Sequence, residues 1–271
     1  MADSQIIGKS VIVTGGASGI GLAIARYFAA LSTKISILDI SAASAQTVVS
    51  SLRAEFPSTI FLFKKCDISS WDEQKAAFEE VYKETGGIDY VFPNAGVSEI
   101  GNFLEKDVGE PMKPTLKTID INLVGALYTI KLAVHYMRKK SSEQKGLIVC
   151  TASNAGLYPF PIAPMYGTSK HGVVGIVRSL AKPLEPEGIR INAICPNCIA
   201  TGLADDNLFS NMLLTPISVA IDAINEFVMN SKLSGVTAEI SGEKFTVREP
   251  PEMVDEMTKK NFDTFWSLGY A

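Results

Sequence analysis

The chain has 271 residues, of which 46% are hydrophobic and 20% charged, which is typical of one large α/β domain. The formal net charge of −4 and the lack of a long Lys/Arg run argue against binding to a phosphate backbone, so no nucleic-acid partner is expected. No apolar stretch reaches the roughly 18 residues of a membrane span, and the first residues do not follow the pattern of a secretory signal. We therefore expect a cytoplasmic protein without a membrane span.

Cysteine and histidine content points away from metal chemistry. The chain has four cysteines and two histidines, too few for a disulfide framework or a histidine-based triad. Cys195 and Cys198 form a CxxC pair, but no second pair or neighbouring histidine accompanies it. Redox or metal use of this pair is the alternative to ordinary buried or loop thiols, and we expect no bound metal.

Apolar, β-branched runs alternate with amphipathic stretches along most of the chain. The pattern predicts a Rossmann-like α/β fold with a doubly wound parallel sheet of about seven strands, because strands that are apolar on both faces need helices above and below. No linker divides it, so residues 1–271 are expected to form a single domain. The predicted strands are 10–14, 34–39, 60–65, 88–92, 147–151, 189–194 and 236–240, and the predicted helices include 20–31, 42–56, 71–84, 217–231 and a tail around 250–267.

A glycine-rich turn, TGGASGIG at 14–21, follows the first strand and opens a helix. Gly15, Gly19 and Gly21 allow a tight turn and close approach of the backbone, and the helix N-terminus offers free N–H groups to a pyrophosphate. A glycine triplet alone is a weak signal, but its place between a strand and a helix predicts dinucleotide binding.

Two carboxylates follow the next strands and bear on the choice of cofactor. Asp39 ends the second strand, where it would accept hydrogen bonds from the adenosine ribose and repel a 2′-phosphate, and no basic residue follows it in 40–42. This favours NAD over NADP. Asp67 holds the matching place after the third strand, near the adenine. The alternative for both is a helix cap.

A second group of polar residues is expected at the same edge of the sheet. Tyr166 and Lys170 are four residues apart, which places them on one helical face, and a cation beside a phenol lowers its pKa toward the working range. Ser153 follows a strand and could hydrogen-bond a substrate oxygen. Asn122 lies within an apolar helical run, where an amide can accept a local distortion and hold a water, or simply bond to a neighbouring helix.

These residues, with Asn94-Ala95-Gly96, resemble the pattern of the short-chain dehydrogenase/reductase family over nearly the whole chain. The resemblance implies that Tyr166 is the general acid or base, Lys170 lowers its pKa and binds the nicotinamide ribose, Ser153 orients the substrate and Asn122 orders a relay water. It also implies a homodimer or homotetramer built on the helices that carry Asn122 and Tyr166. The residues expected to bind the cofactor are Gly15, Ser18, Gly19, Ile20, Gly21, Asp39, Asp67, Ile68, Asn94, Ala95, Gly96, Tyr166, Lys170, Pro196, Ile199 and Thr201.

Some positions depart from the family pattern. Pro93 precedes the Asn-Ala-Gly motif where Asn is frequent, and Asn197 follows Pro196 where Gly is usual, so the pose of the cofactor could differ. Pro183 should end or bend the helix after Lys170. The segment 234–242 in place of a Gly-Gly, with the extended tail, resembles 15-hydroxyprostaglandin-dehydrogenase-type members.

The expected substrate is a small molecule, a bulky apolar secondary alcohol or its ketone. Segment 154–165 is rich in proline and apolar residues, and Phe209, Met212 and Leu213 lie in the region 202–232, which the resemblance makes a substrate lid. The alternative is that these side chains only pack the loops together. For the protein as a whole, the alternatives to an NAD(H)-dependent oxidoreductase are an isomerase or cyclase without net redox change and an NAD-sensing scaffold.

Overall fold

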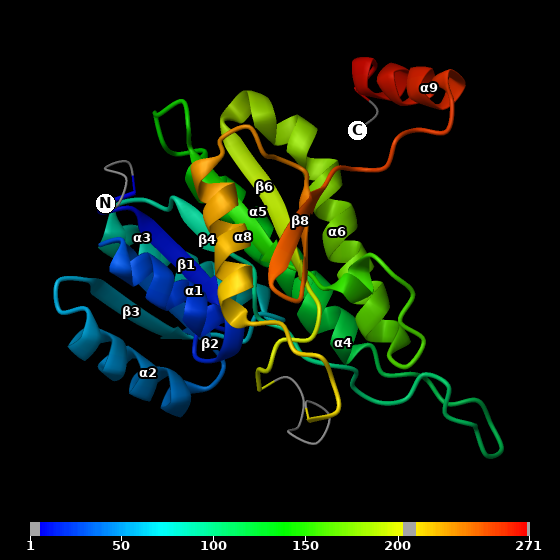
Figure 1. The fold of residues 1–271 in the computed structure, drawn as a ribbon, viewed down its shortest axis with the longest axis horizontal. Coiled ribbons are helices and arrows are strands. Elements are labelled where there is room, and N and C mark those ends of the chain that lie inside the picture. Colours follow the sequence, from blue (N-terminus) through cyan, green and yellow to red (C-terminus); the bar gives the residue numbers. More distant parts are fainter. Residues whose placement is uncertain (1–5, 203–209, 270–271) are drawn as a thin grey trace.

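One eight-stranded sheet forms the centre of the molecule, with the strand order β3-β2-β1-β4-β5-β6-β7-β8 (Figure 1). The structure, a computed structural model, describes residues 6–202 and 210–269. Pairing is parallel from β3 to β7 and antiparallel between β7 and β8. The strands are β1 (Ser10–Thr14), β2 (Lys34–Asp39), β3 (Ile60–Lys65), β4 (Tyr90–Phe92), β5 (Gly146–Thr151), β6 (Ile189–Pro196), β7 (Thr237–Ser241) and β8 (Lys244–Arg248).

The eighth strand corrects the expected count of about seven. β8 returns from β7 through a turn at Gly242, which has a φ of +60°, and its side chains alternate between exposed and half-buried. A five-residue edge strand with this alternation carries little apolar signal, and for that reason the sequence pattern did not reveal it.

Helices cover both faces of the sheet and enclose two apolar clusters. One cluster lies under α1, α2 and α8 and contains Phe28, Leu52 and Phe227, whereas the other lies under α3, α5 and α6 and contains Phe78 and Met137. This layering confirms the doubly wound arrangement. The helices are α1 (Gly19–Ala30), α2 (Ala42–Glu55), α3 (Trp71–Thr85), α4 (Lys117–Ile119), the π-helix η1 (Asp120–Val124), α5 (Gly125–Met137), α6 (Pro164–Leu184), α8 (Ile217–Met229) and α9 (Glu256–Ser267), with short 3-10 turns η2 (Asn154–Gly156) and η3 (Glu185–Glu187).

Two helix ends have identifiable causes. α6 ends one residue after Pro183, as expected from the missing backbone donor of proline. α9 begins at Glu256 because the Asp255 side chain accepts a hydrogen bond from the backbone N–H of Thr258 at 2.7 Å. The prolines at 250 and 251 lie in the extended segment before it.

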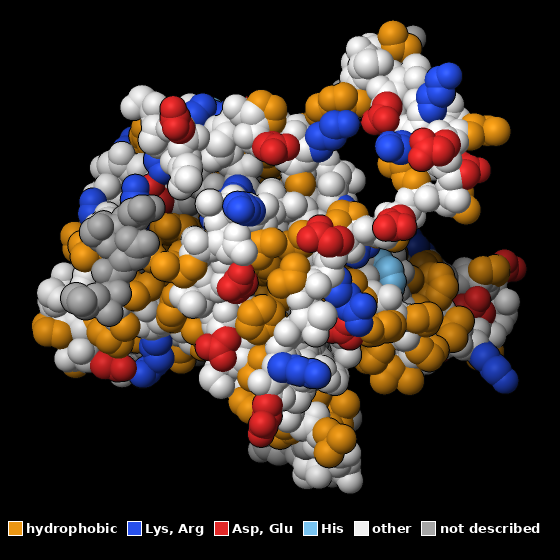
Figure 2. Space-filling view, turned by 45° about the horizontal axis from the view of Figure 1, so that its top comes forward, with side chains coloured by type: hydrophobic (Ala, Val, Ile, Leu, Met, Phe, Trp, Pro, Cys, Tyr) orange, Lys and Arg blue, Asp and Glu red, His pale blue; other side chains and the backbone are white. Residues whose placement is uncertain are grey.

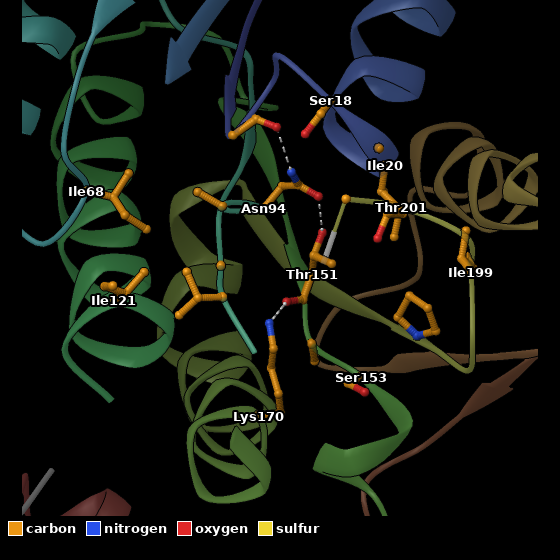
Figure 3. A pocket seen from close by; sticks show the side chains of 18 of the residues that line it. Ser18, Ile20, Ile68, Asn94, Ile121, Thr151, Ser153, Lys170, Ile199 and Thr201 are labelled. Atoms are coloured by element: carbon orange, nitrogen blue, oxygen red, sulfur yellow. Dashed lines mark hydrogen bonds between the residues drawn. The ribbon is translucent and has the colours of Figure 1, made fainter. Parts of the chain in front are cut away.

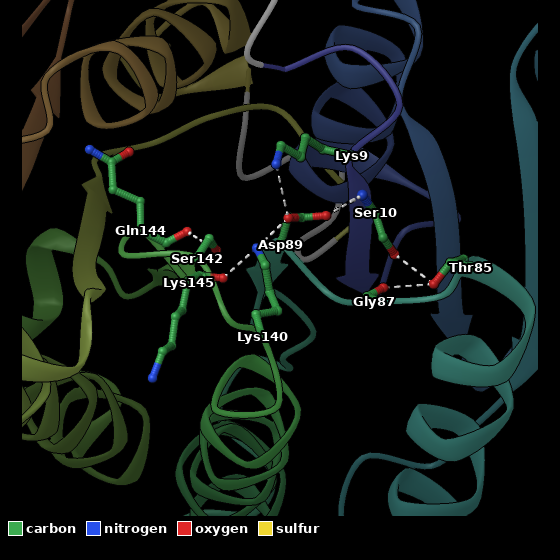
Figure 4. Close-up of polar contacts among 9 residues, drawn as sticks. All are labelled: Lys9, Ser10, Thr85, Gly87, Asp89, Lys140, Ser142, Gln144 and Lys145. Atoms are coloured by element: carbon green, nitrogen blue, oxygen red, sulfur yellow. Dashed lines mark hydrogen bonds and ion pairs between the residues drawn. The ribbon is translucent and has the colours of Figure 1, made fainter.

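The amino-terminal edge of the sheet is tied together by a polar network around Asp89 (Figure 4). The Asp89 carboxylate accepts a hydrogen bond from the backbone N–H of Ser10 at 2.9 Å, pairs with Lys140 and lies 3.5 Å from the ammonium of Lys9. The Ser10 hydroxyl in turn donates to Thr85 at 3.1 Å. The start of β1, the segment between α3 and β4 and the residues after α5 are therefore joined on the side away from the glycine-rich turn.

Candidate active site

The turn between β1 and α1 brings backbone close to backbone. Gly15 adopts a φ of +65°, and a Cβ added there would lie 2.8 Å from the Cα of Ala95. A Cβ at Gly21 would lie 2.2 Å from the carbonyl oxygen of Gly15. Only glycine fits these places, so the first turn of α1 can present its N–H groups to a pyrophosphate.

Asp39 and Asp67 end up beside this turn, at the ends of neighbouring strands. Asp39 accepts hydrogen bonds from the backbone N–H groups of Ala17 at 3.0 Å and Ser41 at 2.9 Å. Asp67 accepts from the N–H and hydroxyl of Ser69 at 2.9 and 2.7 Å, while Ser70 caps α3. The side chain of neither aspartate caps a helix, which removes the alternative role that the sequence left open.

Asn94 connects the glycine-rich turn to the end of β5. Its amide nitrogen donates to the carbonyl of Thr14 at 3.0 Å, and its amide oxygen accepts from the hydroxyl of Thr151 at 3.0 Å. The carbonyl of Thr151 then accepts a hydrogen bond from Lys170 at 2.9 Å. Figure 3 shows this series of hydrogen bonds crossing the cavity from the glycine-rich turn to Lys170. Thr151 was not among the residues predicted from the sequence.

Ser153, Tyr166 and Lys170 converge on one cavity. Ser153 follows β5 and is nearly buried, and Lys170 projects from α6 with only 5% of its surface exposed. The Lys170 ammonium lies 5.6 Å from the centre of the Tyr166 ring. Two hydroxyls and one ammonium therefore border the same space, which is suited to binding and protonating an oxygen atom.

The pKa values of the pair follow from burial. Burial lowers the pKa of Lys170 to about 8, because an apolar surrounding disfavours the cation. Burial also raises the pKa of Tyr166, and a hydrogen bond with Ser153 lowers it by less. The expectation that Lys170 brings the pKa of Tyr166 down is therefore not met in the protein alone.

Asn122 lies behind the cavity, in the π-helix η1. It is 2% exposed, and its side chain accepts from the N–H of Val97 at 2.8 Å and donates to the Val97 carbonyl at 2.9 Å. It also donates to the hydroxyl of Ser169 at 3.2 Å. A Cβ added at Gly96 would lie 3.1 Å from Asn122 Oδ1 and 3.6 Å from Lys170 Nζ. Asn122 thus fixes the loop after β4 next to Lys170. The π-helix η1 around it is a local helix distortion of the kind expected from the sequence.

Glu99 holds the start of α6 next to the cavity, and sequence reasoning missed it. Its carboxylate accepts hydrogen bonds from the backbone N–H groups of Met165 at 3.2 Å and Tyr166 at 2.7 Å, at a helix start where Ala163 offers no side-chain cap. A carboxylate at a helix N-terminus satisfies free donors and complements the dipole. No local pattern reveals this contact, because its partners are more than sixty residues away.

The cavity has a volume of about 370 Å³. Among the residues predicted to bind the cofactor, Gly21 does not line it, and among the predicted catalytic residues Asn122 does not. The residues that line it and were predicted are Gly15, Ser18, Gly19, Ile20, Asp39, Asp67, Ile68, Asn94, Ala95, Gly96, Ser153, Tyr166, Lys170, Pro196, Ile199 and Thr201, and those not predicted include Leu38, Ile40, Val97, Ile121, Thr151, Ala152, Asn197 and Gly202.

Asn197, one of the departures from the family pattern, has a definite partner. Its amide oxygen accepts from the amide of Asn154 at 3.0 Å, and its own amide donates to the hydroxyl of Ser241 at 3.3 Å. Asn154 Oδ1 accepts from the hydroxyl of Ser153 at 3.3 Å. Asn197 therefore connects β7 to the residue next to Ser153. Pro93 keeps an ordinary strand contact, since its carbonyl accepts from the N–H of Thr151 at 3.0 Å.

The lid expected around 202–232 lies only partly within the described residues. Residues 203–209, including Phe209, lie outside them. Met212 and Leu213 are described and exposed, and α8 occupies the rest of the region, packed on the sheet.

The family model of the short chain dehydrogenases matches residues 9–209. The chain belongs to the short-chain dehydrogenase family. Family membership makes it an oxidoreductase that acts on CH–OH groups with a nicotinamide cofactor. The glycine-rich turn and the N-terminus of α1, which face the cavity, fit a nicotinamide dinucleotide.

Relatives within the short-chain dehydrogenase family match most of the chain. The short-chain dehydrogenase/reductase prx7 of Penicillium rubens is 32% identical over 274 residues, covering 90% of this chain and 95% of its own. Human 15-hydroxyprostaglandin dehydrogenase [NAD(+)] is 33% identical over 203 residues, covering 74% of this chain and 72% of its own. This similarity supports membership of the short-chain dehydrogenase family, and the narrower relation to the prostaglandin-dehydrogenase type expected from 234–242 stays a prediction.

Solved structures of short-chain dehydrogenases share the fold. Levodione reductase superposes with a TM-score of 0.76 at 27% identity, covering 87% of this chain and 97% of its own. A short-chain type dehydrogenase/reductase from Mycobacterium marinum gives a TM-score of 0.78 at 23% identity, covering 88% of this chain and 95% of its own.

Within residues 6–202 and 210–269, no three or more His, Cys, Asp or Glu side chains gather closely enough to hold a metal ion. In the same part of the chain, no helix is both long and apolar enough to cross a membrane.

Proposed function

We propose that this protein interconverts a hydrophobic secondary alcohol and its ketone, using NAD(H). The observation that carries the proposal is that Ser153, Tyr166 and Lys170 line the same cavity as the glycine-rich turn and Asp39. Proton-handling groups and a dinucleotide cradle within one cavity allow proton and hydride to reach the same carbon–oxygen group. When bound, the nicotinamide ring supplies the hydride donor or acceptor and, in its oxidised form, a positive charge.

The protein's own side chains transfer the proton, orient the substrate and hold the site in place. Tyr166 gives a proton to the substrate oxygen or takes one from it, and Ser153 orients that oxygen by a hydrogen bond. Lys170, with a pKa of about 8, exchanges protons near neutral pH and donates to the Thr151 carbonyl at 2.9 Å. Asn122 and Glu99 hold the loop after β4 and the start of α6 around these groups.

The preference for NAD rests on Asp39. Each carboxylate oxygen accepts one backbone N–H and keeps a further lone pair for a ribose hydroxyl, and its charge opposes a 2′-phosphate. The sheet register places Lys65 of β3 directly beside Asp39, which the sequence around Asp39 does not show. Asp39 lines the cavity whereas Lys65 does not, which supports Asp39 as the group that would meet the ribose.

An apolar substrate fits the surroundings of Tyr166. The Phe160 ring lies 6.1 Å from the Tyr166 ring, and Ile162 is 83% exposed beside it. Exposed apolar side chains near Tyr166, which itself lines the cavity, favour a substrate that removes them from water. This supports a lipophilic alcohol or ketone over a sugar.

The proposal is tested by following nicotinamide absorbance with a panel of lipophilic secondary alcohols and ketones. The wild type should turn over at least one of them, and Tyr166→Phe should lower kcat by about 100-fold or more, because positioned acid–base groups contribute about 10²–10⁴. NAD affinity should change little. Equal rates in the two proteins, or product formed without an absorbance change, would contradict the proposal.

Cofactor choice is tested separately with Asp39→Ala. The substitution should raise kcat/KM for NADP relative to NAD by about tenfold or more, because a charge repelling the 2′-phosphate is removed. Lys65→Gln serves as the matched control and should leave the ratio unchanged. If Asp39→Ala keeps the selectivity of the wild type, another residue sets it.

A further inference from the structure

Helix α9 is well formed, yet none of its side chains is buried by the rest of the described chain. Phe262 and Phe265 are 60% and 58% exposed, and Met257 and Leu268 also lie in solvent. At 100° per residue these four side chains share one face, with Glu256, Lys259, Lys260 and Asp263 on the other. A capped amphipathic helix with a bare apolar face needs a surface to cover it.

Among the described residues, α9 contacts its own protomer through Lys182 at the carboxyl-terminal end of α6. The ammonium of Lys182 lies 4.7 Å from the centre of the Trp266 ring and 4.0 Å from the carboxylate of Asp263. α6 has 21 residues and is therefore roughly 30 Å long, and Tyr166 lies at its other end. The apolar face of α9 is thus well away from the active site of its own chain.

A second bare apolar surface lies at the amino-terminal end of α6. Residues 101–117 form a fully exposed arm that carries Phe103, Leu104, Val108, Met112 and Leu116, and Phe160 and Ile162 lie beside the start of α6. Figure 1 shows α9 and this arm projecting on the same side of the molecule at opposite ends of α6, and Figure 2 shows apolar side chains gathered there with an open gap before α9.

We infer that α9 of one copy covers the entrance to the active site of a second copy. An isologous dimer brings two copies of α6 side by side in opposite directions, so each carboxyl-terminal end meets the partner's amino-terminal end. α9 then lies against the arm 101–117 and the segment 160–162 of the other chain.

The outer face of α6 permits this approach. Its exposed positions, Thr168, His171, Gly175, Ser179 and Lys182, follow helical spacing along one stripe, and a Cβ added at Gly175 would meet no atom within 4 Å. Two such helices can therefore come close together at their middles while the ends carry the apolar contacts.

Charge favours a second copy over a membrane as the occupant. Residues 249–267 contain five carboxylates and two lysines. A helix that binds an anionic lipid surface carries lysine and arginine on its polar face, and an acidic segment is repelled by that surface.

The covered surface continues into the active site. Phe160 contacts Tyr166, and the arm starts two residues after Glu99, whose carboxylate binds the N–H of Tyr166. α9 of the partner therefore completes the apolar wall beside Tyr166 and helps to select apolar substrates.

Cross-linking tests the contact without relying on activity. In a Cys198→Ser background, copies with Phe262→Cys are mixed with copies carrying Ile162→Cys, allowed to exchange subunits and treated with a short bismaleimide. We expect a covalent heterodimer, whereas Lys260→Cys on the opposite face of α9 should give much less. A monomeric mass in solution, equal yields from both positions, or co-sedimentation of the monomer with anionic vesicles would overturn the inference.

Subunit mixing tests the role in substrate binding, and this second test rests on the proposed function. Phe262→Ser/Phe265→Ser should raise KM for a lipophilic alcohol about tenfold, with NAD affinity unchanged, and mixing with Tyr166→Phe copies should lower KM again. Tyr166→Phe supplies an intact α9, while its own kcat is expected to be about 100-fold or more below that of the wild type. A KM that stays high after mixing means that α9 does not act on the partner. Because cross-linking needs no turnover, failure of this inference and failure of the proposed function are distinguishable.

Discussion

At the scale of single residues, Lys170 shows how burial and charge oppose each other. The unfolded chain holds the Lys170 proton up to its ordinary pKa of 10.5, whereas the folded protein holds it only to about pH 8. Between these values the unfolded state binds more protons, so stability rises as pH rises through this window and is lowest below it.

Lys170→Met should therefore stabilise the protein at pH 7 while abolishing turnover. One pKa unit corresponds to about 1.4 kcal/mol, and loss of the hydrogen bond to Thr151 offsets part of the gain, so an increase on the order of 1 kcal/mol is expected. Urea unfolding from pH 7 to 10.5 measures it. The advantage over the wild type should shrink as pH rises, and a difference that is independent of pH would contradict the argument.

Glu99 acts through the backbone that it holds. Glu99→Ala removes the acceptor for the N–H groups of Met165 and Tyr166 and should lower the free energy of unfolding by about 1–2 kcal/mol. A small shift of Tyr166 should also reduce kcat by up to about 100-fold. Steady-state kinetics should show kcat falling more than KM rises, with partial rescue in Glu99→Gln, which keeps one acceptor oxygen. Equal kcat in Glu99→Ala and the wild type would leave Glu99 a purely structural cap.

At the scale of elements, the glycine-rich turn needs glycine because its backbone segments lie too close together for a side chain. Gly21→Ala would place a methyl group 2.2 Å from the Gly15 carbonyl oxygen, so the turn must shift. We expect NAD affinity to fall at least tenfold, measured by calorimetry. Gly87→Ala is the matched control, because a Cβ there meets nothing within 4 Å and its φ is not positive. If both variants bind NAD as the wild type does, the turn does not hold the dinucleotide.

The elements also show what a sequence can reveal. The predicted strands 10–14, 34–39 and 60–65 coincide with β1, β2 and β3. The first two are inner strands of a parallel sheet and carry continuous apolar, β-branched runs, and the edge strand β3 keeps such a run in its first four residues. β8 was missed because three of its five side chains face solvent. The glycine-rich turn, Asp39, Asn94 and Ser153 lie at or just after strand ends, and Tyr166 and Lys170 share one helix face, so local pattern was informative at these positions. Contacts such as Asn154 with Asn197 depend on segments brought together only by the fold.

At the scale of the whole molecule, the candidate active site and the polar network around Asp89 lie at opposite edges of the sheet. The active-site cavity is at the carboxyl-terminal edge of the strands, and the network of Asp89, Lys9, Lys140 and Ser10 is at the amino-terminal edge. Changes at one edge should leave the other intact.

Asp89→Ala tests this separation. It leaves the N–H of Ser10 and the ammonium of Lys140 without their carboxylate and should lower the free energy of unfolding by about 1–3 kcal/mol, with kcat and KM unchanged. Thermal unfolding and kinetics on the same samples measure both. Glu79→Ala, which removes an exposed pair with Lys83, should lower the free energy of unfolding far less than Asp89→Ala does. A fall in kcat for folded Asp89→Ala would show that the two edges are coupled.

The buried thiols around Lys170 have a consequence for the chemical durability of the protein. Burial raises the pKa of Cys150 and Cys195 to about 12, so almost none of either thiol is thiolate at neutral pH. Alkylating agents and peroxide react with the thiolate and should spare both side chains while the fold is closed. The rate at which iodoacetamide modifies the two thiols therefore reports how often the centre of the molecule opens. A bound dinucleotide should lower this rate.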